Sequence, residues 1–464
     1  MKKLTLTSFA IFSVILTACS QMQINTESGI SLPERFDQAE AAKGSAQIRQ
    51  WWRNWHDPQL TALIEKGLNE NLDIRLARAR LSEAQANSDY AEAERGINIG
   101  ASGSAVGGVS DVNTGVSNPG RSRSGGAYGG ISASWEPDFF GQKRSDADAA
   151  QAVALSAQEQ VYAAQLLVSS EIADNYFRIH ALEQQNAVLE KNIKTMRELQ
   201  RYVQGRFNAG QATAYEVNEI AAQITALQAR QATLKAQADV SQRNIAILTG
   251  TVPQGFSIVK SGNPLAKIPA APSGQLPAAV IERRPDIRAN ALQIQAAAAK
   301  SASARADLYP RFDINFMGRG GRIELNNDLS HISGLSGLAG LDVQLPLFTN
   351  GRIQANIDAA DARLKAALIQ YDKTLLTALG EVDSAYQNHR SLTAQTRLLQ
   401  KSHTQAQKQA SDAQLLFKHD DKTLDVAIRA RVTALNYQEQ LIQSQLAQAQ
   451  NLLGLYKALG GGWL

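Results

Sequence analysis

The spacing of hydrophobic and polar residues predicts two very long helices. The segments 142–204 and 352–417 contain no proline and a single glycine, and they are rich in Ala, Gln, Leu and Lys, which favour helices. A helix over the first segment would be roughly 90 Å long, which exceeds a compact domain. Its apolar residues recur at spacings of three, four, six and seven, as side-by-side packing of helices requires. They are Leu155, Tyr162, Leu166, Ile172, Tyr176, Ile179 and Leu182.

Two glycine-rich segments, 97–135 and 311–345, alternate with a period of two and predict one β-hairpin each. Phe312, Ile314 and Phe316 would share one face of a strand, and Asp313 and Asn315 would share the other. An apolar and a polar face are typical of a membrane barrel wall, although hairpins packed on soluble helices would show the same pattern. Four strands cannot pair all their backbone groups in lipid, so we expect oligomers; three copies would give twelve strands and a lumen.

The two halves of the chain match each other, which predicts an internal duplication. At a spacing of 213 residues, Asp73-Ile74-Arg75 falls on Asp286-Ile287-Arg288. After the glycine-rich segment the spacing is 210, and Gly141, Glu171 and Tyr176 fall on Gly351, Glu381 and Tyr386. We therefore predict five parts: a signal peptide (1–18), a lipid-anchored segment (19–62), repeat 1 (63–255, strands about 97–135), a linker (256–275) and repeat 2 (276–464, strands about 311–345).

The first residues predict export and lipidation. Lys2 and Lys3 precede an apolar run over 4–16, which is typical of a secretory signal and too short to span a bilayer. The run ends in Leu-Thr-Ala-Cys19, which resembles the bacterial lipobox and implies an N-acyl and an S-diacylglycerol group on Cys19. Ser20, by the same analogy, favours the outer membrane. The alternative is that Cys19 is an ordinary small residue of the signal; it is the only cysteine, so no disulfide can form within one chain.

Charge and composition limit the kinds of ligand binding and catalysis that the chain can perform. The formal net charge is +4, of which Lys2 and Lys3 contribute two, and the remainder is spread evenly, which argues against nucleic-acid binding. The six histidines lack metal-ligand spacing and no phosphate loop is present, so we predict neither an enzyme nor a cofactor. After the signal, the methionines are Met22, Met196 and Met317 only. Because soft copper and silver ions prefer thioether ligands, this scarcity argues against a binding site for such ions.

Five motifs resemble the TolC-like outer-membrane efflux proteins, specifically the lipoprotein subset of multidrug efflux systems of the RND type. They are 51–60 (WWRNWHDPQL), 71–74 (NLDI), 135–141 (WEPDFFG), 282–288 (ERRPDIR) and 346–352 (PLFTNGR). The resemblance covers the chain beyond the signal. It implies a mixed α and β fold in which four strands from each of three subunits build a 12-stranded outer-membrane β-barrel, continued by a long periplasmic α-helical barrel.

The resemblance also implies a function and partners. The homotrimer would be the outer-membrane channel of a tripartite efflux pump, and it would passively conduct drugs and other toxic compounds to the exterior. Its partners would be a periplasmic adaptor (membrane fusion protein), an inner-membrane pump of the RND type and outer-membrane lipid. The alternatives are a channel for heavy-metal efflux or type I secretion, or a trimeric structural surface protein.

The turns after the long helices would meet the adaptor. Arg206, Phe207 and Gly210 match the family's first turn, and Phe417 opens the second. The second turn departs from the pattern, since Asp420 stands where glycine is expected. We also expect this turn to be one residue shorter than the first, counted from Phe417 to Asp425.

Acidic residues beyond the second turn constrict the tunnel in members of this family. Asp425 matches the first acidic position, whereas Ile428 stands where some members have the second. The resemblance therefore implies a periplasmic gate at Asp425. Asp421 and Asp420 are further candidates for this gate, with Arg429 or Lys422 as the countercharge. The alternative is that these aspartates are ordinary charges favoured at a helix N-terminus.

Overall fold

The computed structural model describes residues 28–111, 121–258, 262–325 and 330–462. The predicted signal and the lipidation site at Cys19 lie outside these residues. The chain divides into two compact units. Unit 1 contains 82–156 and 290–371, and unit 2 contains 30–81, 157–289 and 372–464.

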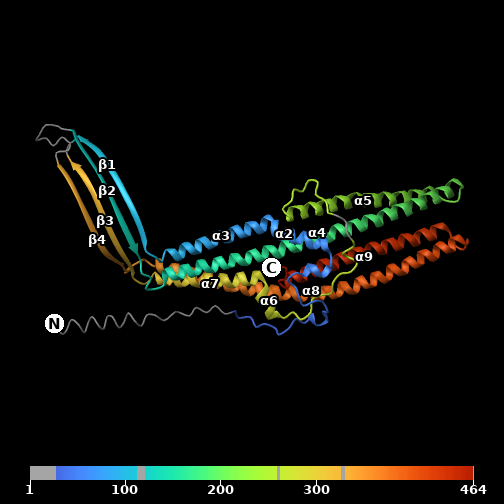
Figure 1. Cartoon of the computed structure of the whole chain (residues 1–464). Helices are drawn as coiled ribbons and strands as arrows, with labels where there is room; N and C mark the ends of the chain where they lie inside the picture. The colour runs from blue at the N-terminus through green and yellow to red at the C-terminus, as the bar shows by residue number, and fades with distance from the viewer. Residues whose placement is uncertain (1–27, 112–120, 259–261, 326–329, 463–464) are drawn as a thin grey trace. The chain divides into compact units, whose positions relative to one another are not determined.

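Unit 1 carries a curved four-stranded antiparallel sheet in the order β1-β2-β3-β4 (Figure 1). Its strands are β1 (Asn98–Asp111), β2 (Arg121–Trp135), β3 (Arg311–Leu325) and β4 (Ser330–Gln344). The register pairs Phe312 with Val343 and Asp313 with Asp342. Since cross-strand partners share a face, the apolar and polar residues lie on opposite faces of the sheet, as the alternation predicts.

Four helices have residues in both units: α3 (Leu72–Ala93), α4 (Gln142–Asn208), α7 (Pro285–Ala306) and α8 (Arg352–Lys418). Unit 2 adds η1 (Ala39–Ala41), η2 (Trp51–Trp55), α2 (Pro58–Glu70), α5 (Ala214–Leu248), α6 (Pro277–Arg283) and α9 (Leu424–Ala458). Helices α4 and α8 have 67 residues each, and α5 and α9 have 35 each. The mixed fold class and the internal duplication are thus confirmed. No helix in the described ranges is long and apolar enough to cross a membrane.

Alanine packing corrects one expectation about α4. The pattern placed Leu155 on a packed face, but its side chain is exposed. The buried positions beside it are Ala152, Ala154 and Ser156, so the buried side chains in this part of unit 1 are small and the bulky leucine lies outside. Of the other six apolar positions predicted in α4, four are buried, and Tyr162 and Leu182 are half-buried.

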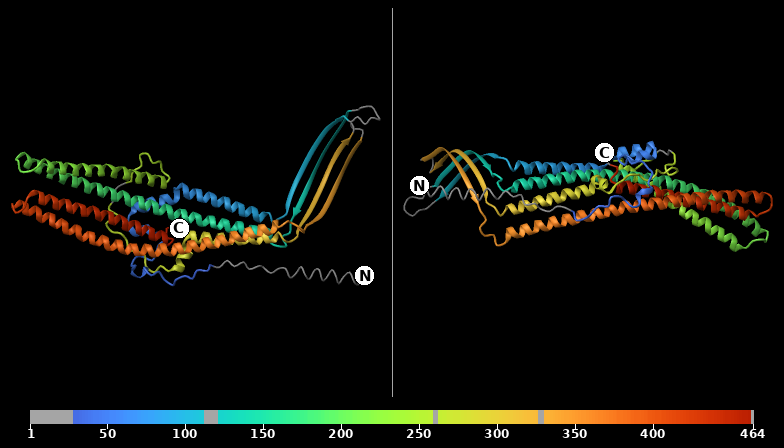
Figure 2. Two further views of the ribbon diagram at one scale, coloured as in Figure 1. Left: turned by 180° about the vertical axis from the view of Figure 1, so that it is seen from behind. Right: turned by 90° about the horizontal axis from the view of Figure 1, so that it is seen from below.

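An aromatic cluster forms the centre of unit 2. Trp51 stacks on Tyr456 at 5.5 Å between ring centroids, and Trp55 stacks on Phe177 at 5.1 Å. The Tyr176 hydroxyl donates a hydrogen bond to Asp57 Oδ2 at 2.8 Å. This cluster fixes the 3-10 turn η2 against α4 and α9, and it holds the bases of the two long hairpins, α4–α5 and α8–α9. The turns of both hairpins lie at the same end of unit 2 (Figure 2).

Candidate functional site

The first hairpin turn is closed by backbone and side-chain hydrogen bonds. Gly210 has a φ of 73°, which a residue without a Cβ adopts at little cost, and its N–H donates to the Phe207 carbonyl at 2.9 Å. Arg206 contributes twice: its carbonyl accepts from the Gln211 N–H at 2.7 Å, and its guanidinium donates to the Gln211 carbonyl at 2.8 Å. These contacts satisfy the last carbonyls of α4, as a helix end requires.

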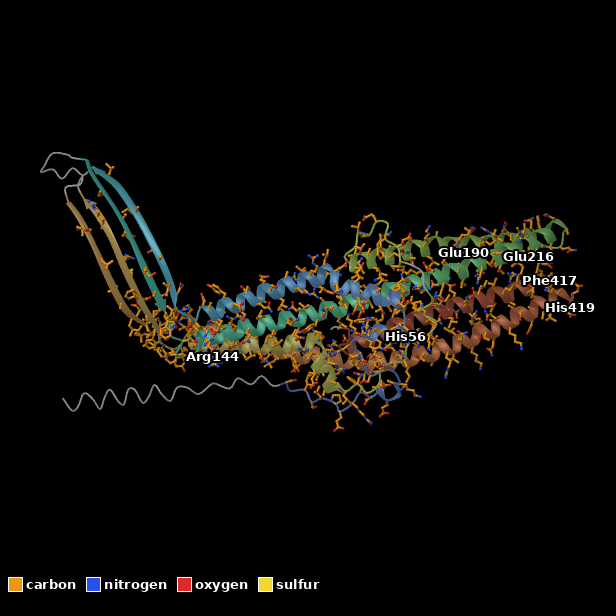
Figure 3. All side chains as sticks on the ribbon, in the orientation of Figure 1. His56, Arg144, Glu190, Glu216, Phe417 and His419 are labelled. Carbon is orange, nitrogen blue, oxygen red and sulfur yellow. The ribbon has the colours of Figure 1, made fainter. Side chains whose placement is uncertain are left out.

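A capping box starts α5 directly after this turn. The Thr213 hydroxyl accepts from the Glu216 N–H at 3.3 Å, and the Glu216 carboxylate accepts from the Thr213 N–H at 2.7 Å. The Thr213 backbone N–H, its hydroxyl and the charge of Arg206 together hold the pKa of Glu216 below its ordinary value. Glu216 therefore stays ionised at the exposed tip (Figure 3).

The second turn has the same geometry as the first, and the expectation that it is one residue shorter is wrong. Asp420 occupies the left-handed conformation, with a φ of 59°, at the position equivalent to Gly210. The N–H groups of Asp420 and Asp421 donate to carbonyls of the last turn of α8, as in the first turn. Helices α5 and α9 begin 210 residues apart, as α4 and α8 do. Asp425 is therefore equivalent to Tyr215 rather than to Glu216, and α9 has no capping box.

The predicted gate residues fall into two groups at this tip. Asp420 and Asp421 are exposed on the turn itself, next to Phe417 and His419 at the end of the hairpin (Figure 3). Asp425 lies in the first turn of α9, with its Oδ2 4.0 Å from Arg429 Nε. The Arg429 side chain is 78% exposed, so this contact is screened and weak.

Ile428 has a different role from its neighbours on α9. It is fully buried in a cluster with Met196 of α4 and with Ile220 and Ile224 of α5. An acidic residue at this position would lose its hydration, so the local packing accounts for an apolar side chain here. Ile428 therefore packs the start of α9 against the first hairpin.

Two ion pairs that the sequence pattern did not predict also join α9 to the first hairpin. Arg431 Nη1 donates to Glu198 of α4 at 2.8 Å. Glu439, which is buried, accepts from both terminal nitrogens of Arg230 on α5. The partners lie more than 200 residues apart in sequence, and no local spacing signals them. Together with Ile428 they define which face of α9 turns toward the first hairpin.

The model of the outer membrane efflux protein family matches residues 63–251 and 276–461. The chain belongs to this family. Three relatives match it over nearly their full lengths. The pyoverdine export outer membrane protein OpmQ of Pseudomonas aeruginosa is 28% identical and is aligned over 100% of this chain and 97% of OpmQ. The cation efflux system protein CusC of Escherichia coli is 26% identical (97% of each chain), and the antibiotic efflux pump outer membrane protein ArpC of Pseudomonas putida is 26% identical (99% and 96%).

The fold agrees with a solved member of this group. The outer-membrane channel OprN superposes with a TM-score of 0.80 over 95% of this chain and 99% of its own, at 23% identity. The chain is thus an outer membrane efflux protein by family, and it has the fold of an outer-membrane channel.

Proposed function

We propose that this outer membrane efflux protein is the exit channel of a tripartite drug-efflux pump. Three copies form the channel, a periplasmic adaptor contacts the helical tips, and an inner-membrane pump of the RND type supplies the energy. The cargo is drugs and other toxic organic compounds. Lipid on Cys19 adds a tether to the outer membrane.

The pairing of strands in the sheet is the observation that supports the proposed trimer. Within the described residues, β1 and β4 each pair with a single strand, so each leaves one edge of backbone N–H and C=O groups without a partner. In lipid an unpaired backbone group costs several kcal/mol, so the edges must meet other strands. Pairing β4 of one copy with β1 of the next closes a barrel, and twelve strands leave room for a passage.

The hairpin tips carry the proposed contacts and gate. The proposed adaptor contacts are Arg206, Phe207 and Gly210 of the first turn and Phe417 of the second. They offer the adaptor a basic group, two aromatic rings and an accessible backbone. Asp425, with Asp420 and Asp421 nearby, brings like charges toward the axis in a trimer. Their repulsion is relieved by water and by Arg429, and it falls further when the tips separate.

Organic cargo is favoured over metal cargo by two observations. The chain beyond the signal has only three methionines, which gives few soft ligands for copper or silver. OpmQ and ArpC are named for pyoverdine and antibiotics, which are organic molecules. The relation to CusC favours cation efflux as the second candidate.

Deletion and complementation test the proposal. A strain without this chain should become more susceptible to several antibiotics and dyes, and the wild-type copy should restore resistance. Copper and silver serve as the comparison arm: sensitivity confined to these metals would overturn the drug assignment in favour of cation efflux. In planar bilayers, purified protein should give discrete conductance steps, and their absence would contradict the channel itself.

A further inference from the structure

The two repeats build the same hydrogen bond with two different residues. Asn71, between α2 and α3, donates from Nδ2 to the Leu248 carbonyl at the end of α5, at 2.9 Å. Arg284, 213 residues later between α6 and α7, donates from Nη1 to the Ala458 carbonyl at the end of α9, at 3.1 Å. Both side chains are buried. The shared contact shows that Asn71 and Arg284 occupy equivalent positions.

In repeat 2 the guanidinium of Arg284 is held by two carboxylates. Asp286 accepts a bidentate pair of hydrogen bonds, from Nε at 3.0 Å and from Nη2 at 2.7 Å. Glu381 accepts from Nη1 at 2.7 Å. Planar guanidinium groups suit this geometry, and such charge-assisted bonds are about twice as strong as neutral ones. Repeat 2 therefore contains a complete guanidinium site that is filled by the chain itself.

Repeat 1 keeps both carboxylates but lacks the arginine. Asp73 is equivalent to Asp286 and Glu171 to Glu381, whereas Asn71 is short and neutral. Among the described residues neither carboxylate has a hydrogen-bond or ion-pair partner. Both line a cavity of about 970 Å³ between α4, α5, α9 and the start of α3. The cavity holds one cation, Arg178, and its Nε already lies 2.9 Å from Asp174.

We propose that this cavity binds a small organic cation through a guanidinium or amidinium group held between Asp73 and Glu171. Acidic residues alone would not identify a ligand; the second repeat shows what this pair binds when an arginine is present. The volume suits a drug-sized molecule, and Leu182, Val240 and Ile247 provide apolar lining for its body. The proposal that this site selects cargo rests on the proposed efflux function. It assigns organic cations as one class of compound that the channel carries.

Binding to the purified full-length protein tests the site. Benzamidine, an aromatic amidinium, is the probe and neutral benzamide is its matched control, with isothermal titration calorimetry as the measurement. Benzamidine should bind and benzamide should not, and added salt should weaken the binding. The double variant Asp73→Asn, Glu171→Gln keeps the size of both side chains and should bind benzamidine at least about tenfold more weakly. Asp239→Asn, on α5 outside the cavity lining, should bind as the wild type does.

Three results would overturn the site: no benzamidine binding, equal binding of benzamide, or unchanged binding by the double variant. Asn71→Arg gives an independent check. In repeat 2 an arginine at this position fills the site, so the variant should bind no benzamidine while it keeps the wild-type circular dichroism spectrum. A folded Asn71→Arg variant that binds benzamidine normally would contradict the proposed position of the ligand.

Susceptibility separates the cargo assignment from the proposed function. Cells that carry the double variant should lose resistance to a diamidine drug and keep resistance to an uncharged one. If the variant exports both drugs as the wild type does, the site has no part in cargo selection and the efflux function stands. If the wild-type chain confers resistance to neither drug, the proposed function fails, and the cargo assignment fails with it.

Discussion

Replacing Arg284 by alanine removes the link between repeat 2 and the end of α9. The side chain is only 10% exposed and makes hydrogen bonds to Asp286, Glu381 and the Ala458 carbonyl. Breaking a buried ion pair from one side costs about 3–5 kcal/mol. Here the Asp286 and Glu381 side chains are 44% and 49% exposed and regain water, which lowers the cost. Including the unpaired carbonyl, we expect a loss of about 2–3 kcal/mol in the free energy of unfolding.

The pH dependence of this loss has a defined sign. Burial by itself would raise the pKa of Asp286, but the hydrogen bonds and charge of Arg284 outweigh it and hold the pKa below its ordinary value. A carboxylate with a lowered folded pKa stabilises the protein above its unfolded pKa of about 4, and this contribution disappears as the pH falls through the folded value. The difference between wild type and Arg284→Ala should therefore be largest near neutral pH and shrink below about pH 4.

Thermal unfolding followed by circular dichroism at a fixed scan rate measures the effect. Because the unfolding entropy grows with chain length, a loss of this size in a chain of 464 residues should lower the unfolding temperature by roughly 2–3 °C at neutral pH. Arg78→Ala, at an exposed position on α3, is the matched control and should shift the transition far less. A shift no larger than that of the control, or a shift that is the same at neutral and at acid pH, would refute the ion-pair reasoning.

Four other changes test separate features. Cys19→Ala should abolish labelling by radioactive palmitate and alter sorting more than transport; complete loss of efflux by correctly inserted protein would show a larger role for the lipid. Asp425→Ala should raise single-channel conductance or its voltage sensitivity, and unchanged values would exclude it from the gate. Gly462→Ala should lower the unfolding temperature by an amount that corresponds to about 1–3 kcal/mol, because the new Cβ would lie 2.8 Å from Trp51 Nε1 at a φ of 114°; a neutral effect would contradict this packing. Asp420→Gly should stabilise the second turn by about 1 kcal/mol, seen as slower local hydrogen exchange, and faster exchange would count against strain at that φ.

Periodicity predicted the fold well because it is a local signal. The alternation over Phe312, Asp313 and Ile314 gave the faces of β3, and the absence of proline and glycine gave the extent of α4 and α8. The predicted length of the second turn was wrong because Asp425 was matched to Glu216 by charge. The backbone geometry makes Asp425 equivalent to Tyr215, one position before Glu216.

The contacts between helices could not be predicted in the same way. Arg431 and Glu198, or Arg230 and Glu439, meet only when two hairpins lie side by side, and each residue alone has the pattern of a solvated helix surface. The match of Asp73 with Asp286 already placed Asn71 on Arg284. Only the structure shows that Asn71 and Arg284 both donate a hydrogen bond to the last carbonyl of a hairpin helix.

The shared position of Asn71 and Arg284 also bears on how the chain evolved. A channel assembled from separately translated half-length chains would carry one residue at both places, because a single gene would encode every copy. Within one chain the two positions can mutate independently, and the hydrogen bond to the hairpin end is present in each repeat. One half now carries a permanent internal counterion and the other does not, so reconstructed ancestral half-length chains should show which residue came first.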